Sequence, residues 1–300
     1  MLDFNEYLDI NEIVGYGNVK DNLLSITQYA VSNYFADKPL FKDNNFKYYF
    51  YDDYVFNTNT SINNYMTLYV EINQPQNVKE SQNKKFIKKD PNIKDLHLSL
   101  QNIKDGIFQG LLNCFDSNTL LWQEQYSINL SINERVDGKK INYLFRVIPC
   151  FTYKNENNIN GVVYYNNDLN KVEIEYPVLS TKNIKAKEKN TNKLYLYYDV
   201  LLKNILQAER KENYTYFEIF ESLLYNVPDK LFEDKTEKTL IQILNFLRNN
   251  NLKEYKTIDE QDYMFTSKYK SFSILYVKHA LNQIEKHIKK SQKNITSNNE

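Results

Sequence analysis

Hydrophobic and polar residues follow two different periods along this chain. In the first two thirds, apolar and polar positions alternate in several short segments, which is typical of strands. These segments lie at 46–56, 65–72, 126–132, 141–151 and, as a further hairpin, 151–176. Helical spacing interrupts them twice, from Gly17 onward and over 96–115. The polar stretches 36–46, 76–94 and 180–193 read as loops or connectors.

After residue 194 the spacing is helical throughout. The predicted helices cover 194–210, 214–226, 236–250 and 271–290. The pattern therefore predicts an α/β domain at 1–193, a helical domain at 194–290, and a disordered polar tail at 291–300. We therefore expect an α+β fold, with strands and helices in the first domain and a C-terminal helical domain.

The segment 65–72 has the clearest alternation in the chain. Met66, Leu68, Val70 and Ile72 share one face, and Tyr65, Thr67, Tyr69 and Glu71 share the other. We expect a half-buried strand whose polar side is open to ligands and which Pro75 ends. A shift of one residue would exchange the two faces, so the alternation also fixes the register.

Composition narrows the functional classes. Thirty-eight basic and 38 acidic residues cancel, which argues against a polybasic surface for nucleic acid. Mean hydropathy is −0.65, and no apolar run approaches the ~18 residues of a membrane span. Cys114 and Cys150 form neither a disulfide framework nor a metal clip. We expect a cytoplasmic protein without membrane contact, with Cys150 buried and inert in an apolar strand.

Common catalytic and cofactor motifs are absent from the sequence. It contains no GxGxxG, no GxxxxGK[ST], no HExxH and no GxSxG. Its only histidines are His97, His279 and His287, which are too few and too scattered for a zinc site. We expect no metal at these residues and no other cofactor.

The order of segments nevertheless resembles the nucleotidyltransferase superfamily. The likeness extends from about residue 15 to 288 and is closest to the bacterial cyclic-oligonucleotide synthase and oligoadenylate synthase branch. Two segments carry it most specifically, Val147-Ile148-Pro149-Cys150-Phe151 and Glu221-Ser222-Leu223-Leu224-Tyr225-Asn226-Val227-Pro228. The resemblance implies a nucleotidyltransferase-like mixed sheet with flanking helices, followed by a C-terminal helical domain. It also implies a protein that binds a nucleoside triphosphate and two divalent cations and transfers a nucleotidyl group.

The catalytic positions of that family are altered here. Members carry a Gly-Ser turn, a strand with Asp-x-Asp, and a third Asp before the Val-Val-Pro-like strand. On these positions the sequence has Asp52 and Asp53, then Tyr65 and Thr67, and finally Arg146. Hard cations need oxygen anions, and a guanidinium would repel them. We therefore assign no residue a catalytic role and expect metal-dependent transfer to be lost.

Three hypotheses remain open from the sequence. The first is a nucleotidyltransferase-fold pseudoenzyme that acts as a binding or regulatory module for a nucleotide, an RNA or a protein partner. The second is an active Mg²⁺-dependent enzyme, transferring NMP to a nucleotide, RNA or protein, with Asp52, Asp53 and Glu71 as shifted carboxylates.

The third is a metal-free nucleotide or RNA sensor in which Arg146 grips phosphate. The resemblance places Lys203 where relatives carry a phosphate-contacting lysine, and Lys187 lies in the basic connector. Arg146 could also form a salt bridge with Asp52 or Asp53, which would tie the altered positions together.

Overall fold

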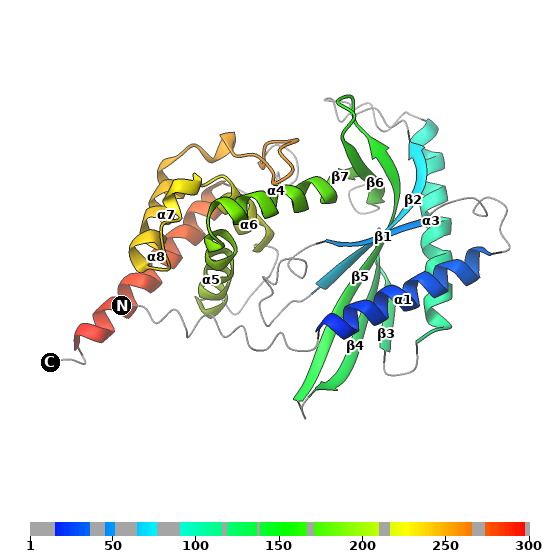
Figure 1. Cartoon of the computed structure of the whole chain (residues 1–300), viewed down its shortest axis with the longest axis horizontal. Helices are drawn as coiled ribbons and strands as arrows, with labels where there is room; N and C mark the ends of the chain where they lie inside the picture. The colour runs from blue at the N-terminus through cyan, green and yellow to red at the C-terminus, as the bar shows by residue number, and fades with distance from the viewer. Residues whose placement is uncertain are drawn as a thin grey trace. The chain divides into compact units, whose positions relative to one another are not determined.

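The computed structural model describes residues 16–36, 46–51, 65–76, 91–115, 119–136, 139–166, 171–209, 217–265 and 274–297 (Figure 1). Asp52 and Asp53 lie outside these residues. The described residues up to Leu179 form one compact unit, called here the sheet unit, and those from Ser180 form the other, the helical unit. This division falls earlier in the chain than residue 193, and each unit is described by itself.

The described part of the sheet unit contains a seven-stranded mixed sheet and two helices. The main path of the sheet runs β1-β2-β5-β4-β3, and β6 and β7 continue it from the far end of β5. The strands are β1 (Phe46–Tyr51), β2 (Tyr65–Gln76), β3 (Thr119–Gln123), β4 (Ile128–Val136), β5 (Lys139–Lys154), β6 (Asn160–Asn166) and β7 (Lys171–Glu175). Among the described strands, only β2 and β5 pair in parallel, and every other pair of neighbours is antiparallel.

Two helices, α1 (Tyr16–Phe35) and α3 (Pro91–Leu112), pack against each other and against one face of the sheet. Their buried residues, including Leu23, Val31, Ile103 and Ile107, join the strands in one hydrophobic cluster. The two helices approach closely at Gly110, where an added Cβ would lie 2.7 Å from the Ala30 carbonyl oxygen. Glycine is needed there because any side chain would push the helices apart.

The helical unit contains most of α4 and the helices that follow it. The helices are α4 (Pro177–Asn190), α5 (Leu194–Glu209), α6 (Phe217–Tyr225), α7 (Glu237–Asn249) and α8 (Ile274–Ser297), with short 3₁₀ turns at Asp229–Leu231 and Leu252–Glu254. Helix α7 begins at an N-cap, Thr236, whose side chain accepts a hydrogen bond from the Thr239 amide. Helices α5, α6, α7 and α8 are held together by buried Leu, Ile and Val side chains.

Several expectations from the sequence are wrong in detail. The connector expected at 180–193 is mostly helix α4, whose buried residues Ser180, Ile184 and Lys187 recur every three or four positions, followed by the buried Thr191 just past its end. A buried lysine and two hydroxyl residues disguise this stripe in the sequence. Helix α8 continues to Ser297, well into the segment expected to be a disordered tail.

The strand predictions also need correction. Strand β3 was not predicted, because its five residues do not alternate. Strand β2 does not stop before Pro75 but reaches Gln76, past an irregularity in its pairing with β5 after Ile72. The half-buried strand at 65–72 is wrong for Met66 to Ile72, since all seven residues are buried. An interior parallel strand is covered on both faces, so its polar residues are enclosed as well.

Candidate functional site

Three polar side chains lie side by side across the centre of the sheet. Thr67 of β2 is in register with Arg146 of β5, and Arg146 is in register with Asn129 of β4. Neighbouring strands are about 4.8 Å apart, and residues in register project from the same face. Thr67 is 7% exposed and Asn129 is fully buried, whereas Arg146 is half-buried. We call Thr67, Arg146 and Asn129 the polar row, and the sheet face that carries it the Arg146 face.

The structure brings together two of the three residues aligned with family carboxylates. Thr67 and Arg146 are neighbours in the polar row. Tyr65 lies two residues earlier in β2, opposite Leu144, and its side chain is outside the part that the structure describes. The predicted ion pair of Arg146 with Asp52 or Asp53 also involves undescribed residues. The sequence did not indicate Asn129, because its place in the row depends on the pairing of β4 with β5.

A second polar group occupies the same sheet face, farther along β2. Glu71 accepts a hydrogen bond from the Thr152 hydroxyl at 2.6 Å, and the Lys47 ammonium lies 3.6 Å from the same carboxylate oxygen. Tyr69 donates to Glu175, and its ring stacks on Tyr49 with centroids 5.5 Å apart. Burial, reinforced by Cys150 and Glu71, raises the pKa of Tyr49 well above its ordinary value.

Glu71 belongs to this second group and lies far from the polar row. Four residues of strand separate Glu71 from Thr67, which corresponds to about 13 Å. Cys150, opposite Glu71, is fully buried, and burial raises the pKa of its thiol well above the ordinary value. The thiol is therefore protonated at neutral pH and a poor nucleophile, as its apolar strand predicts.

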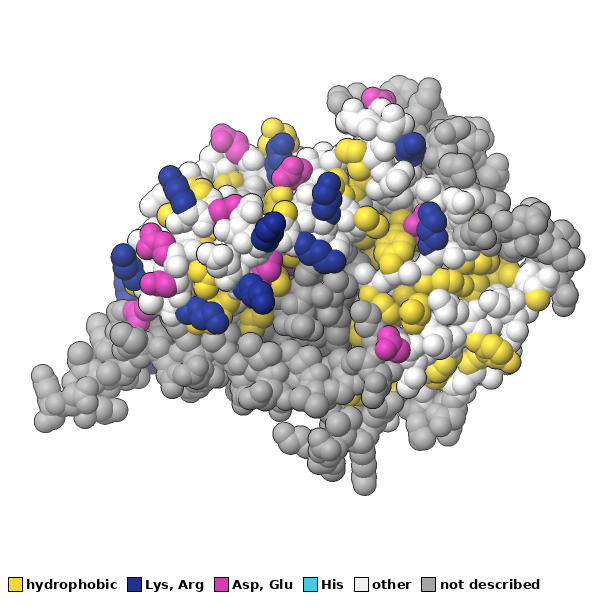
Figure 2. Space-filling view, viewed as in Figure 1, with side chains coloured by type: hydrophobic (Ala, Val, Ile, Leu, Met, Phe, Trp, Pro, Cys, Tyr) yellow, Lys and Arg dark blue, Asp and Glu magenta, His cyan; other side chains and the backbone are white. Residues whose placement is uncertain are grey.

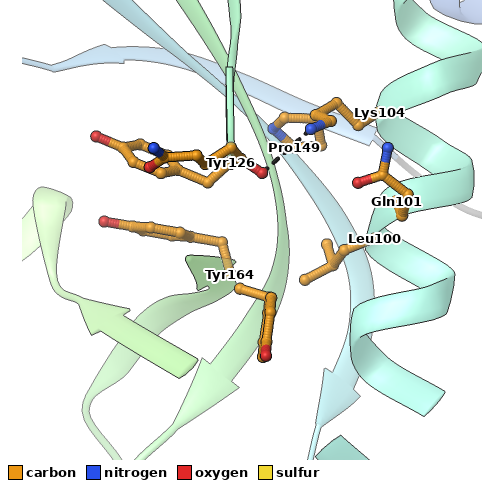
Figure 3. A pocket seen from close by; sticks show the side chains of 8 residues that line it. Leu100, Gln101, Lys104, Tyr126, Pro149 and Tyr164 are labelled. Carbon is orange, nitrogen blue, oxygen red and sulfur yellow. Dashed lines mark hydrogen bonds between the residues drawn. The ribbon is translucent and has the colours of Figure 1, made fainter. Parts of the chain in front are cut away.

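A small cavity lies on the opposite face of the sheet, between α3 and the strands (Figure 3). Its volume of about 10 Å³ has room for about one water molecule. The buried Lys104 ammonium donates to the carbonyl oxygens of Glu124 and Gln125 at 2.8 and 3.1 Å, so these three polar groups satisfy one another. Tyr126 and Tyr164 stack beside it with centroids 5.1 Å apart. This cavity is a packing site between helix and sheet.

Comparison with known proteins identifies the fold. Residues 182–289 match the family of the cGAS/DncV-like nucleotidyltransferase C-terminal helical domain. The chain is similar in structure to the Rhodothermus marinus CdnE c-UMP-AMP synthase solved with Apcpp and Upnpp, at 18% identity and a TM-score of 0.63 over 85% of this chain and 87% of that chain.

The CdnE cyclic dinucleotide synthase of Elizabethkingia meningoseptica, solved with GTP and Apcpp, is 19% identical with a TM-score of 0.62 over 89% of each chain. No curated protein sequence matches the chain. The chain has the fold of a cGAS/DncV-like nucleotidyltransferase. This likeness agrees with the resemblance to nucleotidyltransferases and confirms the fold class expected from the sequence.

The nucleotidyltransferase family implies a pair of divalent cations, and the residues of the polar row do not fit them. The row offers a hydroxyl, an amide and a guanidinium, whereas Mg²⁺ is held by carboxylates, phosphates and water. Across the residues that the structure describes, no three His, Cys, Asp or Glu side chains are grouped as metal ligands. None of the described helices is long and apolar enough to span a bilayer.

Two lysines expected to contact nucleotide in this nucleotidyltransferase fold are enclosed within the helical unit. Lys187 of α4 is 8% exposed; its ammonium donates to the Val227 carbonyl and contacts Asp229 Oδ1 at 2.6 Å. Burial lowers the pKa of Lys187, and Asp229 opposes that shift. The Lys203 ammonium lies 2.7 Å from Asp199 Oδ2, one turn earlier in α5, and both side chains are almost wholly buried.

The segment Glu221–Pro228, which supported the family resemblance, is the hydrogen-bonding centre of the helical unit. The Asn226 side-chain amide donates to the carbonyl oxygens of Ser222 and Lys256, both at 2.8 Å, and its oxygen accepts from the Lys256 amide. Tyr195 donates from α5 to the Glu221 carbonyl at 3.1 Å. These contacts join α5, α6 and the 3₁₀ turn before Lys256, so the motif has a structural role.

Proposed function

We propose that this chain is a nucleotidyltransferase-fold protein that no longer transfers nucleotides and instead acts as a binding or regulatory module. The supporting observation is the polar row, in which Arg146 lies beside Thr67 at the centre of the sheet. A guanidinium is permanently charged and offers several N–H donors in a plane, so it binds a phosphate without a metal.

The ligand class follows from the related folds. The Rhodothermus marinus and Elizabethkingia meningoseptica enzymes were solved with nucleoside triphosphates or their analogues. We propose that a nucleoside triphosphate, or the phosphate end of an RNA, binds the Arg146 face through Arg146. Lys187 and Lys203 contribute to the helical unit rather than to this contact, because each already has a carboxylate partner.

The first test is catalysis. Purified full-length protein is incubated with α-labelled ATP, GTP, CTP and UTP, singly and mixed, with Mg²⁺ and separately with Mn²⁺. We expect no linear or cyclic product above the protein-free control. Product that disappears in Glu71→Gln would contradict the proposal and would support an active enzyme with shifted carboxylates.

The second test is binding. A ligand at 100 times its Kd stabilises the folded protein by about 2.7 kcal/mol, so its melting temperature rises by several degrees. We expect such a rise with at least one nucleoside triphosphate or a short 5′-triphosphorylated RNA, without added metal. Arg146→Ala should abolish it, and Arg146→Lys should weaken it. The control is Lys154→Ala, an exposed residue at the end of the same strand. No rise with any ligand at millimolar concentration would contradict the proposal.

A further inference from the structure

Strand β3 forms an open edge of the sheet. In the part of the chain that the structure describes, β3 pairs with β4 and with no other strand (Figure 1). Its sequence, Thr-Leu-Leu-Trp-Gln, has no charged residue, and the Leu120 side chain is 63% exposed. An exposed, uncharged, apolar edge strand is a template for pairing with another chain.

The other two edges of the sheet differ from β3 in charge. Strand β1 carries Lys47, and strand β7 carries Lys171, Glu173 and Glu175. Charged side chains on an edge are a common protection against unwanted pairing, because they would have to be desolvated. Among the described edges, only β3 lacks this protection.

The hydrogen-bond pattern shows which backbone groups of β3 face outward. The Glu124 amide donates to the Ser127 carbonyl at 2.9 Å, which closes the turn between β3 and β4. In an antiparallel ladder, residues alternate between bonded and non-bonded positions. Trp122 and Leu120 therefore direct their backbone groups toward β4, whereas those of Thr119, Leu121 and Gln123 point away from the sheet.

We propose that β3 pairs antiparallel with β3 of a second copy of this chain, around a two-fold axis at Leu121. This register places Thr119 opposite Gln123 of the second copy and Leu121 opposite its own counterpart. These three pairs use the outward groups on both strands and supply about six backbone hydrogen bonds. No like charges meet, since the strand has no charge.

The apolar side chains agree with the same register. Leu120 lies opposite Trp122 of the second copy, and the reverse pair forms by symmetry, giving two aliphatic–aromatic cross-strand pairs. Trp122 is also in register with Asn129, so its side chain lies on the Arg146 face, beside the end of the polar row. The two-fold axis is perpendicular to the sheet, so the sheets of the two copies join into one. The dimer would therefore carry both polar rows on the same face.

The first experiment is sedimentation equilibrium of the full chain from about 1 to 200 µM. One chain has a mass of 35.9 kDa, and the mean mass should approach twice this value as concentration rises. A five-residue pairing is a small interface, so an affinity in the micromolar range is expected. A wild-type chain that stays monomeric across the whole range would overturn the proposal.

Three variants test the pairing itself. Gln123→Pro removes an outward N–H without removing a bond to β4, and it should leave a monomer. The double variant Thr119→Lys with Gln123→Lys puts like charges opposite each other in both outer pairs, and it should also be monomeric. The matched double variant Thr119→Glu with Gln123→Lys puts opposite charges there and should still dimerise. Equal masses for the two double variants would overturn the antiparallel register.

Amide hydrogen exchange separates loss of pairing from loss of folding. In the folded monomer the amides of Leu120 and Trp122 are protected by β4, and those of Leu121 and Gln123 exchange rapidly. In the wild-type chain, protection at Leu121 should rise with protein concentration and should not rise in the double-lysine variant. Protection at Leu121 that is independent of concentration would contradict the proposed dimer.

Discussion

Replacing Lys203 with methionine should strongly destabilise the helical unit. The Lys203 ammonium and the Asp199 carboxylate are 2.7 Å apart, and their side chains are only 1% and 0% exposed. At an effective dielectric constant of 20, two unit charges at this distance attract by about 6 kcal/mol. Desolvating both ions costs several kcal/mol each, so the intact pair contributes little net stability. Lys203→Met removes this attraction and leaves the buried Asp199 carboxylate without its lysine, for a loss of about 3–5 kcal/mol.

Urea unfolding followed by the helical circular dichroism signal measures this effect. With a slope of about 2 kcal/mol per molar urea, the midpoint should fall by about 1.5–2.5 M. The double variant Asp199→Leu with Lys203→Met removes both charges and should return to within about 1 kcal/mol of the wild type.

Lys289→Met is the matched control, because Lys289 has the same spacing and distance to Glu285 but is 65% exposed. Its cost should stay below about 0.5 kcal/mol. The reasoning is refuted if Lys203→Met is no more destabilising than Lys289→Met. Loss of a nucleotide response without loss of stability would instead mean that Lys203 is available to a ligand.

Three smaller predictions concern single contacts. Tyr255→Phe should raise stability by up to about 1 kcal/mol, because the buried Tyr255 hydroxyl has no hydrogen-bond partner among the described residues. Burial raises the pKa of Tyr255 to about 12, so the unfolded chain loses this proton at a lower pH than the folded protein, and wild-type stability should fall as the pH rises from 10 to 12. In thermal melts at pH 9, 10 and 11, the melting temperature of Tyr255→Phe should fall less than that of the wild type. Gly110→Ala should lower the melting temperature, because overpacking against the Ala30 carbonyl costs about 1–3 kcal/mol and exceeds the gain of up to about 1 kcal/mol in helix propensity. Thr236→Ala should cost about 1 kcal/mol in urea unfolding by removing the N-cap of α7, and Thr236→Ser should not.

The sequence predicts those elements whose burial is one-sided and apolar. Helix α8 is an example, because Val277, Leu281, Ile284 and Ile288 form one buried stripe at helical spacing. Helix α4 was read as a connector because one of its buried positions is Lys187, whose ammonium donates to the distant Val227 carbonyl. Burial of a polar residue depends on a partner that its own segment does not contain, so the local pattern could not reveal it.

The candidate site follows the same distinction. Alternation correctly separated Thr67 from Met66 and Leu68 on opposite faces of one strand, because the face that a side chain occupies is a local property of the strand. It could not show that this face is buried at Thr67, or that Asn129 completes the row. Those facts depend on β4 and β5 pairing over many residues. The phosphate role expected for Lys203 came from the resemblance and that for Lys187 from its place in a basic segment, and both residues have carboxylate partners within the helical unit.

The contacts that support the fold do not depend on the residues of the polar row. The fold rests on the apolar face under α1 and α3 and on the contacts of Glu221–Pro228, neither of which involves the polar row. Carboxylates gathered for metal binding repel one another without the cation, so such a cluster lowers stability and does not support the fold. The polar row of Thr67, Arg146 and Asn129 carries no such repulsion. This architecture therefore does not need acidic residues at these positions, and structural similarity alone does not report on catalysis. The assay with labelled nucleotides addresses the site directly, which the likeness in fold does not.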